Sequence, residues 1–388
     1  MSGGGGRIRR VHAEQVLSAI TPLLDAGRVP GAVVGLRHEG RVTVAAGGTT
    51  APGGGDRLPA DCVVRIASNT KPMIAALTMV LVQDGVLALD KPVERHLPEL
   101  ALRRVLRRVD GPLDDTVAAH RPVTVEDLLT MRMGFGWVFE ADSPAFAAAA
   151  DLGLGFGPPD PTGQPAPDEW IARFATLPLL EQPGRVWRYE LAFAVLGVLL
   201  ARATGQPLAT LLAERLFDPL GMTATGFTAD PARLVPAFVR DGDALVPFDG
   251  VTDSRWLAPP RFPDARGGLV STAADLLRFA GMLLDGGDGL LTAASVAAMT
   301  TDQLTAEQRR GPSAATFLDS GGWGYGVGVT ERPVGRRYGW AGGLGTLWYS
   351  WPDHGLAAVL LTQVTPPTAD VFEAFTGSVE GMLARGRR

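Results

Sequence analysis

The sequence Val64-Arg65-Ile66-Ala67-Ser68-Asn69-Thr70-Lys71-Pro72 introduces a wide apolar stripe with helical spacing. The apolar positions of that stripe are Ile74, Leu77, Val80 and Leu81. Pro72 fits the first turn of a helix, where its missing N–H would have no intrahelical partner, and Gly85 is a typical C-terminal stop. We therefore predict a buried helix from Ser68 to about Gln83.

Ser68 and Lys71 lie three residues apart, so this helix would place the lysine amine beside the serine hydroxyl. The first turn also offers free N–H groups and a partial positive charge, which suit a developing oxyanion. A lysine in apolar surroundings can lose its proton and act as a base for the serine. Only Lys71 and Lys91 are lysines among 36 basic residues. The residues alone leave two interpretations open: a Ser-Lys nucleophile, or a serine N-cap followed by a solvated lysine.

Length and composition restrict the class of protein. The 388 residues are enough for one large domain or two interlocked ones. A hydrophobic content of 46% excludes a disordered chain, and a net charge of -5 argues against a nucleic-acid binder. The single cysteine, Cys62, excludes an internal disulfide and a cysteine-based metal cluster.

The N-terminus carries no apolar segment of the secretory kind, since MSGGGGRIRR is followed directly by an amphipathic stretch. No window reaches 18 uninterrupted apolar residues. We expect a cytoplasmic protein with no membrane partner.

Strand patterns gather at the two ends of the chain. A hairpin is predicted from Gly31–Arg37 and Arg41–Gly47, with a glycine-rich loop over Gly47–Gly55. The later strand patterns are Gly322–Thr330, Arg336–Ala341, Gly345–Trp351 and Leu356–Thr362. Flanking helices are expected at Val11–Ala26 and Thr368–Ala384. Together these patterns predict one sheet built from both ends of the chain.

The middle of the sequence is mostly helical. Helices are predicted at Val125–Met131, Asp168–Ala175, Ala192–Thr204, Leu208–Leu216 and Thr272–Leu284. We therefore expect a discontinuous α/β domain of residues 1–90 and 265–388, a helical insertion domain of residues 91–264, and an active site at their interface. The Pro/Gly-rich segment Gly153–Asp168 is either a lid or a surface excursion, and its composition favours the excursion.

Several other chemistries lack support in the sequence. The histidines His12, His38, His96, His120 and His354 are scattered, with no H-E-x-x-H pattern. The chain also has no G-x-S-x-G elbow. We expect neither a metal nor another cofactor.

Residues 64–72 resemble the nucleophile motif of the serine β-lactamase and penicillin-binding-protein superfamily, in particular its class C-like branch. Further segments match in order: Pro30–Val34, Leu87–Val93, Thr124–Thr130, Pro183–Gly197 and Gly267–Thr272. The resemblance spans residues 28–365. It implies an α/β (α+β) class C β-lactamase-like fold, in which helices flank an antiparallel sheet and a mainly helical domain is inserted.

The resemblance implies that Ser68, Lys71 and Tyr189 are the catalytic residues. Tyr189 stands at the family's second motif, and a phenol beside a lysine can relay a proton between nucleophile, leaving group and water. Most β-lactamases have an asparagine two positions later, where this chain has Leu191. That departure resembles some esterases of the branch.

The family's third motif falls on Trp340-Ala341-Gly342-Gly343, which is similar to the version in family VIII carboxylesterases. An indole cannot grip a carboxylate as the usual cation does, but it offers apolar area and one N–H. The resemblance implies an oxyanion hole from the Ser68 and Gly343 amides, with Trp340 and Gly342 against the substrate. Further candidates for the acyl pocket are Phe135, Trp137, Phe139, Trp187 and Trp348.

The sequence therefore predicts a serine hydrolase with a Ser68 acyl-enzyme, and most directly a carboxylesterase of small or medium acyl esters. An acyltransferase that uses the same intermediate is the main alternative. A β-lactamase or D-amino-acid peptidase is disfavoured by Trp340 and Leu191. A non-catalytic binding module is the least favoured, because Ser68, Lys71 and Tyr189 are all present.

Overall fold

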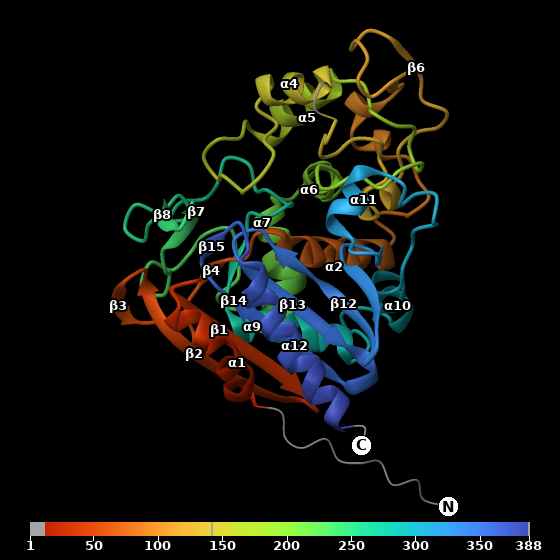
Figure 1. The fold of residues 1–388 in the computed structure, drawn as a ribbon. Coiled ribbons are helices and arrows are strands. Elements are labelled where there is room, and N and C mark those ends of the chain that lie inside the picture. Colours follow the sequence, from red (N-terminus) through yellow and green to blue (C-terminus); the bar gives the residue numbers. More distant parts are fainter. Residues whose placement is uncertain (1–11, 141–142, 387–388) are drawn as a thin grey trace, which may run out of the picture.

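The computed structural model describes residues 12–140 and 143–386. At its centre is an eight-stranded antiparallel sheet with the order β10-β11-β12-β13-β14-β1-β2-β3 (Figure 1). Its strands are β1 (Gly31–His38), β2 (Arg41–Ala51), β3 (Gly54–Arg57), β10 (Gly322–Trp323), β11 (Gly328–Arg332), β12 (Gly335–Gly342), β13 (Thr346–Trp351) and β14 (Leu356–Leu361). The two ends of the chain meet where β1 pairs with β14.

Helices cover both faces of this sheet. On one face α1 (Ala13–Asp25) and α12 (Ala369–Gly386) lie side by side, and on the other lies α9 (Ala273–Leu284) (Figure 1). Successive residues of β1 point to opposite faces of the sheet. Val34 packs in the core under α1 and α12, and Val33 packs in the core under α9. The central strand β14 is buried along its whole length, as expected for a strand covered on both sides. The predicted antiparallel sheet flanked by helices is confirmed.

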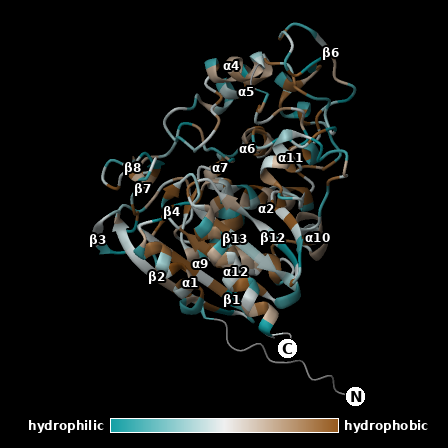
Figure 2. Cartoon of the chain, in the orientation of Figure 1, coloured by the Kyte–Doolittle hydropathy of each residue, from teal (hydrophilic) through white to brown (hydrophobic). Residues whose placement is uncertain are grey.

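Helix α2 (Thr70–Gln83) is the predicted buried helix, and the 3-10 turn η1 (Ala67–Asn69) leads into it. Every residue from Thr70 to Leu81 is buried. A helix that is apolar on all sides belongs in a core, and Figure 2 shows hydrophobic residues concentrated where the sheet meets α2 and α9.

The remaining helices are α3 (Val125–Leu129), α4 (Pro144–Asp151), α5 (Pro167–Ala175), α6 (Ala192–Thr204), α7 (Leu208–Leu212), α8 (Asp218–Leu220), α10 (Ala293–Thr300) and α11 (Pro312–Phe317). The small sheets are β4 (Val64–Arg65) with β9 (Val270–Ser271), β5 (Arg104–Leu106) with β6 (Thr116–Ala118), and β7 (Ala237–Asp241) between β8 (Ala244–Asp249) and β15 (Val364–Thr365).

Two local predictions differ from the structure. The loop expected at Gly47–Gly55 is instead the end of β2, a turn at Gly53 and the start of β3. Because β3 is an exposed edge strand rich in glycine, it lacks the alternation that reveals a half-buried strand. The middle of the chain contains the additional helix α4 and two small sheets. The division at residues 90/91 and 264/265 stays a prediction.

Within residues 12–140 and 143–386, no single helix has both the length and the apolar composition to cross a membrane. One bent pair, α6 with Leu208–Leu220, meets the test jointly, with an angle of 86° between its halves.

A buried ion pair fixes the strand that leads to η1. Arg65 of β4 donates from Nε to Asp249 Oδ2 (2.8 Å) and from Nη1 to the Val235 carbonyl (2.6 Å), and both side chains of the ion pair are almost fully buried. Burial raises the pKa of Asp249, but hydrogen bonds from Ser254 and Arg255 and the charge of Arg65 outweigh it, so this pKa lies below its usual range.

We predict that Asp249→Asn destabilises the protein by about 3 to 5 kcal/mol at neutral pH, because it leaves the Arg65 charge buried without its counter-ion. Since the native pKa of Asp249 is depressed, its contribution is complete above the usual aspartate pKa of about 4 and is lost as the pH falls through the lower native value. Urea unfolding of the wild type and the variant at neutral and acidic pH measures the difference between their free energies of unfolding. This difference should be smaller at acidic pH. Asp90→Asn, in an exposed pair with Lys91, is the matched control and should change little.

Candidate active site

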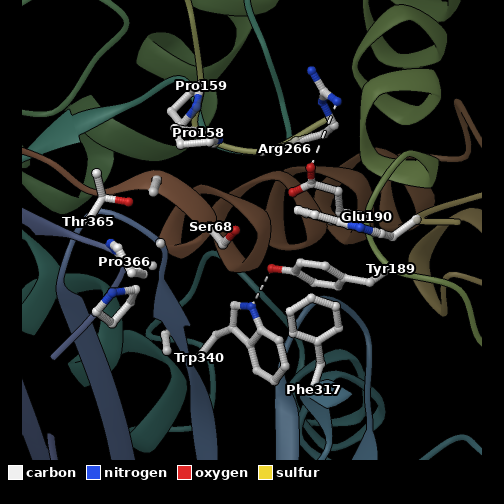
Figure 3. A pocket seen from close by; sticks show the side chains of 18 of the residues that line it. Ser68, Pro158, Pro159, Tyr189, Glu190, Arg266, Phe317, Trp340, Thr365 and Pro366 are labelled. Carbon is white, nitrogen blue, oxygen red and sulfur yellow. Dashed lines mark hydrogen bonds and ion pairs between the residues drawn. The ribbon is translucent and has the colours of Figure 1, made fainter. Parts of the chain in front are cut away.

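A cavity of about 430 Å³ lies at the N-terminal end of α2 (Figure 3). Its walls come from η1, β12, the segments before α6 and β9, α11, and two proline-rich loops. The lining residues are Ala67, Ser68, Trp137, Gly157, Pro158, Pro159, Tyr189, Glu190, Asp264, Arg266, Gly267, Thr316, Phe317, Trp340, Ala341, Gly342, Gly343, Tyr349, Thr365, Pro366 and Pro367. Most of these side chains are apolar or aromatic, as in small-molecule sites generally.

Ser68 reaches the cavity from a strained turn. Ala67, immediately before it, has a φ of 45°, a left-handed conformation that costs a non-glycine residue about 1 to 2 kcal/mol. The turn is held by Thr346, whose hydroxyl donates to the Ile66 carbonyl (2.9 Å) and accepts from the side-chain Nδ2 of Asn69 (3.0 Å). These contacts from β13 hold Ser68 at the cavity edge.

Lys71 is fully buried one helical turn after Ser68. Its Nζ is 2.8 Å from Ser68 Oγ, 2.7 Å from the Arg266 carbonyl oxygen and 3.3 Å from Glu190 Oε2. The amine therefore touches the serine hydroxyl and two groups that only accept hydrogen bonds.

Tyr189 lies beneath the lysine, with Lys71 Nζ 4.6 Å from the centre of its ring. Its hydroxyl accepts a hydrogen bond of 2.7 Å from Trp340 Nε1 and points into the space that Ser68 faces (Figure 3). The ring packs on Phe317 and Trp187, with centroids 4.4 and 5.7 Å away. The structure thus brings Ser68, Lys71 and Tyr189 together, with Ser68 and Tyr189 on the cavity wall and Lys71 buried against both.

Strand β12 forms another wall with Trp340 and Gly342, and Gly343 follows directly after the strand. A side chain at Gly342 would overlap the Ile66 carbonyl oxygen and the Thr346 hydroxyl. The close approach of this strand to η1 therefore requires glycine at position 342. Gly343 borders the cavity across from Ser68 and has open space beside its Cα.

Only one of the five further aromatic residues expected at the acyl pocket lines the cavity. Trp137 lines the cavity, while Phe135, Trp187 and Trp348 are core residues that do not. Phe135 packs edge-on against Phe174, Trp187 against Tyr189 and Trp323, and Trp348 against Phe279. Phe139 lies outside the lining but stacks on Trp137. Their placement depends on tertiary packing, which a one-dimensional pattern does not contain.

The sequence reasoning missed the charged residues of the site, Glu190, Arg266 and Asp264. Arg266 forms a two-point pair with Asp264 and lies 3.9 Å from Glu190 Oε1. Burial lowers the pKa of Arg266, but Asp264 and Glu190 raise it above its usual value, so the guanidinium stays charged. A carboxylate at the start of the apolar helix α6 was the available signal for Glu190.

The segment Gly153–Asp168 forms part of the cavity wall through Gly157, Pro158 and Pro159. It is tied to the site because Arg266 Nη1 donates to the Gly155 carbonyl (2.6 Å). Within the described ranges, no group of three or more His, Cys, Asp or Glu side chains could hold a metal ion.

In a comparison with known proteins, the family model described as Beta-lactamase matches residues 16–380 of this chain. Protein Rv1367c of Mycobacterium tuberculosis is 37% identical over 93% of this chain and 92% of its own length. Esterase EstB of Burkholderia gladioli is 32% identical over 78% of this chain and 77% of its own. The solved structure of EstCE1, a hydrolase with promiscuous acyltransferase activity, has a TM-score of 0.79 at 24% identity and covers 97% of this chain and 98% of its own.

We predict that Gly342→Ala lowers the free energy of unfolding by about 1 to 3 kcal/mol, because the new methyl group must displace the backbone of Ile66. The urea midpoint measures the loss. Gly343→Ala is the matched control and should unfold close to the wild type, since its methyl group meets no atom within 4 Å. Equal midpoints for Gly342→Ala and the wild type would contradict the proposed close contact.

Proposed function

Because this chain belongs to the beta-lactamase family, we propose that it is a carboxylesterase that hydrolyses small and medium acyl esters through an acyl-enzyme on Ser68. The observation that carries the proposal is the 2.8 Å contact between Lys71 Nζ and Ser68 Oγ at the edge of an apolar cavity. The family and its relatives named as esterases make the chain a serine hydrolase-type enzyme. The substrate class and the residue roles below belong to the proposal.

In the first step, Ser68 Oγ attacks the ester carbonyl carbon while neutral Lys71 takes the serine proton. The amides of Ser68 and Gly343 stabilise the oxyanion that forms on the carbonyl oxygen. When the tetrahedral intermediate collapses, the ester C–O bond breaks and the leaving alkoxide receives a proton through Tyr189. The products of this step are an alcohol and the acyl-serine.

In the second step, water attacks the acyl-serine and passes a proton to the Tyr189–Lys71 pair. Collapse of the second intermediate returns a proton to Ser68 Oγ and releases the carboxylic acid. The Trp340 indole N–H donates to the phenol oxygen of Tyr189, and this bond fixes the position of the oxygen through which the proton passes.

Two features of the site support an uncharged ester over a β-lactam. Trp340 stands where the family usually has a cation, and its single N–H already binds Tyr189. The charge of Arg266 is already paired with Asp264, while Glu190 brings a negative charge to the cavity. A substrate carboxylate would therefore enter without a free cation, which is costly in a buried site.

A panel of substrates tests this function. We expect wild-type protein to hydrolyse p-nitrophenyl acetate and butyrate, and Ser68→Ala to lose about 1,000-fold or more of that rate because its nucleophile is gone. A chromogenic cephalosporin should be a poor substrate. Ester consumption that rises with added alcohols or amines and gives the transfer product would assign an acyltransferase instead. Rapid cephalosporin hydrolysis would contradict the role given to Trp340, and a wild-type protein with no turnover of any substrate would contradict the function.

A second prediction concerns the Trp340 indole. Trp340→Phe should lower kcat for p-nitrophenyl butyrate by about 10-fold or more, because Tyr189 loses its hydrogen-bond donor while the aromatic area stays. Steady-state kinetics measure the effect. Trp137→Phe, at another lining aromatic, serves as the control and should change KM more than kcat. An unchanged kcat in Trp340→Phe would show that Tyr189 does not depend on this bond.

A further inference from the structure

A buried carboxylate lies beside Lys71 and has no part in the mechanism above. Glu190 follows Tyr189 in the chain, borders the cavity and is almost fully buried. Its Oε2 is 3.3 Å from Lys71 Nζ, and its Oε1 has no hydrogen-bond partner among the described residues. A buried charge in this position calls for a physical reason.

The contacts of Lys71 dictate the direction of its lone pair. A neutral amine has two N–H groups and one lone pair, and it lies among three oxygen atoms. The Arg266 carbonyl and an ionised Glu190 can only accept hydrogen bonds, so they take the two N–H groups. The lone pair then faces Ser68 Oγ, which is the orientation needed to remove the serine proton.

The same contacts suit the ammonium that forms after the proton moves. Its three N–H groups match the three oxygens, and its positive charge stands beside the Glu190 carboxylate. Arg266, which is paired with Asp264, places a second positive charge 3.9 Å from Glu190 Oε1. The other groups that face the amine are Ser68 and the ring of Tyr189.

We propose that Glu190 is a positioning residue: its carboxylate orients the Lys71 amine toward Ser68 and lies beside the ammonium that forms when Lys71 takes the serine proton. This inference rests on the proposed function, because it assigns a role in the activation of the same nucleophile. It follows the general logic in which a third group orients the base of a nucleophile–base pair.

The test compares the wild type with Glu190→Gln, which keeps the side-chain size and removes the charge. Two reactions are followed from about pH 5 to about pH 10: hydrolysis of p-nitrophenyl butyrate, and covalent labelling of Ser68 by a serine-directed phosphonate, read by intact mass. We expect both rate constants to fall about 100-fold at their optimum, because the base loses its orienting partner.

The pH at which the rate falls to half its maximum on the acid side of the profile, called the acid limb, distinguishes a positioning role of Glu190 from a purely structural one. In Glu190→Gln the ammonium of Lys71 has no carboxylate beside it, so the pH of half-maximal rate should move down. Glu190→Asp keeps the charge and should keep the acid limb near its wild-type pH even where the rate falls. Glu181→Gln, which alters a carboxylate paired with Arg188 outside the cavity, is the matched control and should change neither readout.

Two results would overturn the inference and leave the function intact. The first is wild-type rates in Glu190→Gln, and the second is a slower variant whose acid limb has not moved. A wild-type protein that neither hydrolyses the ester nor takes up the phosphonate would overturn the proposed function, and this inference with it.

Discussion

The burial of the Lys71 amine is the constraint on which the site depends. An amine without water must find its hydrogen-bond partners within the protein. Here those partners come from Ser68 in the same helical turn, from Glu190, 119 residues later, and from the Arg266 carbonyl, 195 residues later. Three distant parts of the chain therefore have to meet at one nitrogen atom, and the turn at η1, the start of α6 and the segment before β9 are placed accordingly.

Once Lys71 has taken the serine proton, the charges of the site form an alternating series of Asp264, Arg266, Glu190 and Lys71. Each charge has an opposite neighbour, so the series can be buried at lower cost than its members separately. The space in front of it is mostly apolar. The protein thus combines a polar relay behind the nucleophile with a cavity that offers little to a charged substrate.

The sequence predicted what local periodicity controls and missed what long-range packing controls. The apolar stripe gave the helix after Ser68, and the strand patterns gave the sheet built from both ends of the chain. The edge strand β3 was missed because its exposed glycines carry no alternation. The Lys71–Glu190 contact and the Trp340–Tyr189 hydrogen bond were missed because each joins residues more than a hundred positions apart in the sequence. Trp187 and Trp348 were expected at the acyl pocket but are core residues. Whether an aromatic ring lines a cavity or is buried in the core depends on the folded packing, which the sequence pattern does not contain.

The pairing of β1 with β14 also governs how the protein can be made. Val34 lies opposite Leu360, so the interior strand β1 cannot pair with its neighbour β14 until the end of the chain has been synthesised. A ribosome adds about 5 to 20 residues each second, so the nascent β1–β2 hairpin leaves one edge unpaired for tens of seconds. Such an edge can pair with other chains. Synthesis therefore exposes this protein to aggregation until its last strands emerge, and chaperone protection of the N-terminal hairpin would be most valuable during that interval.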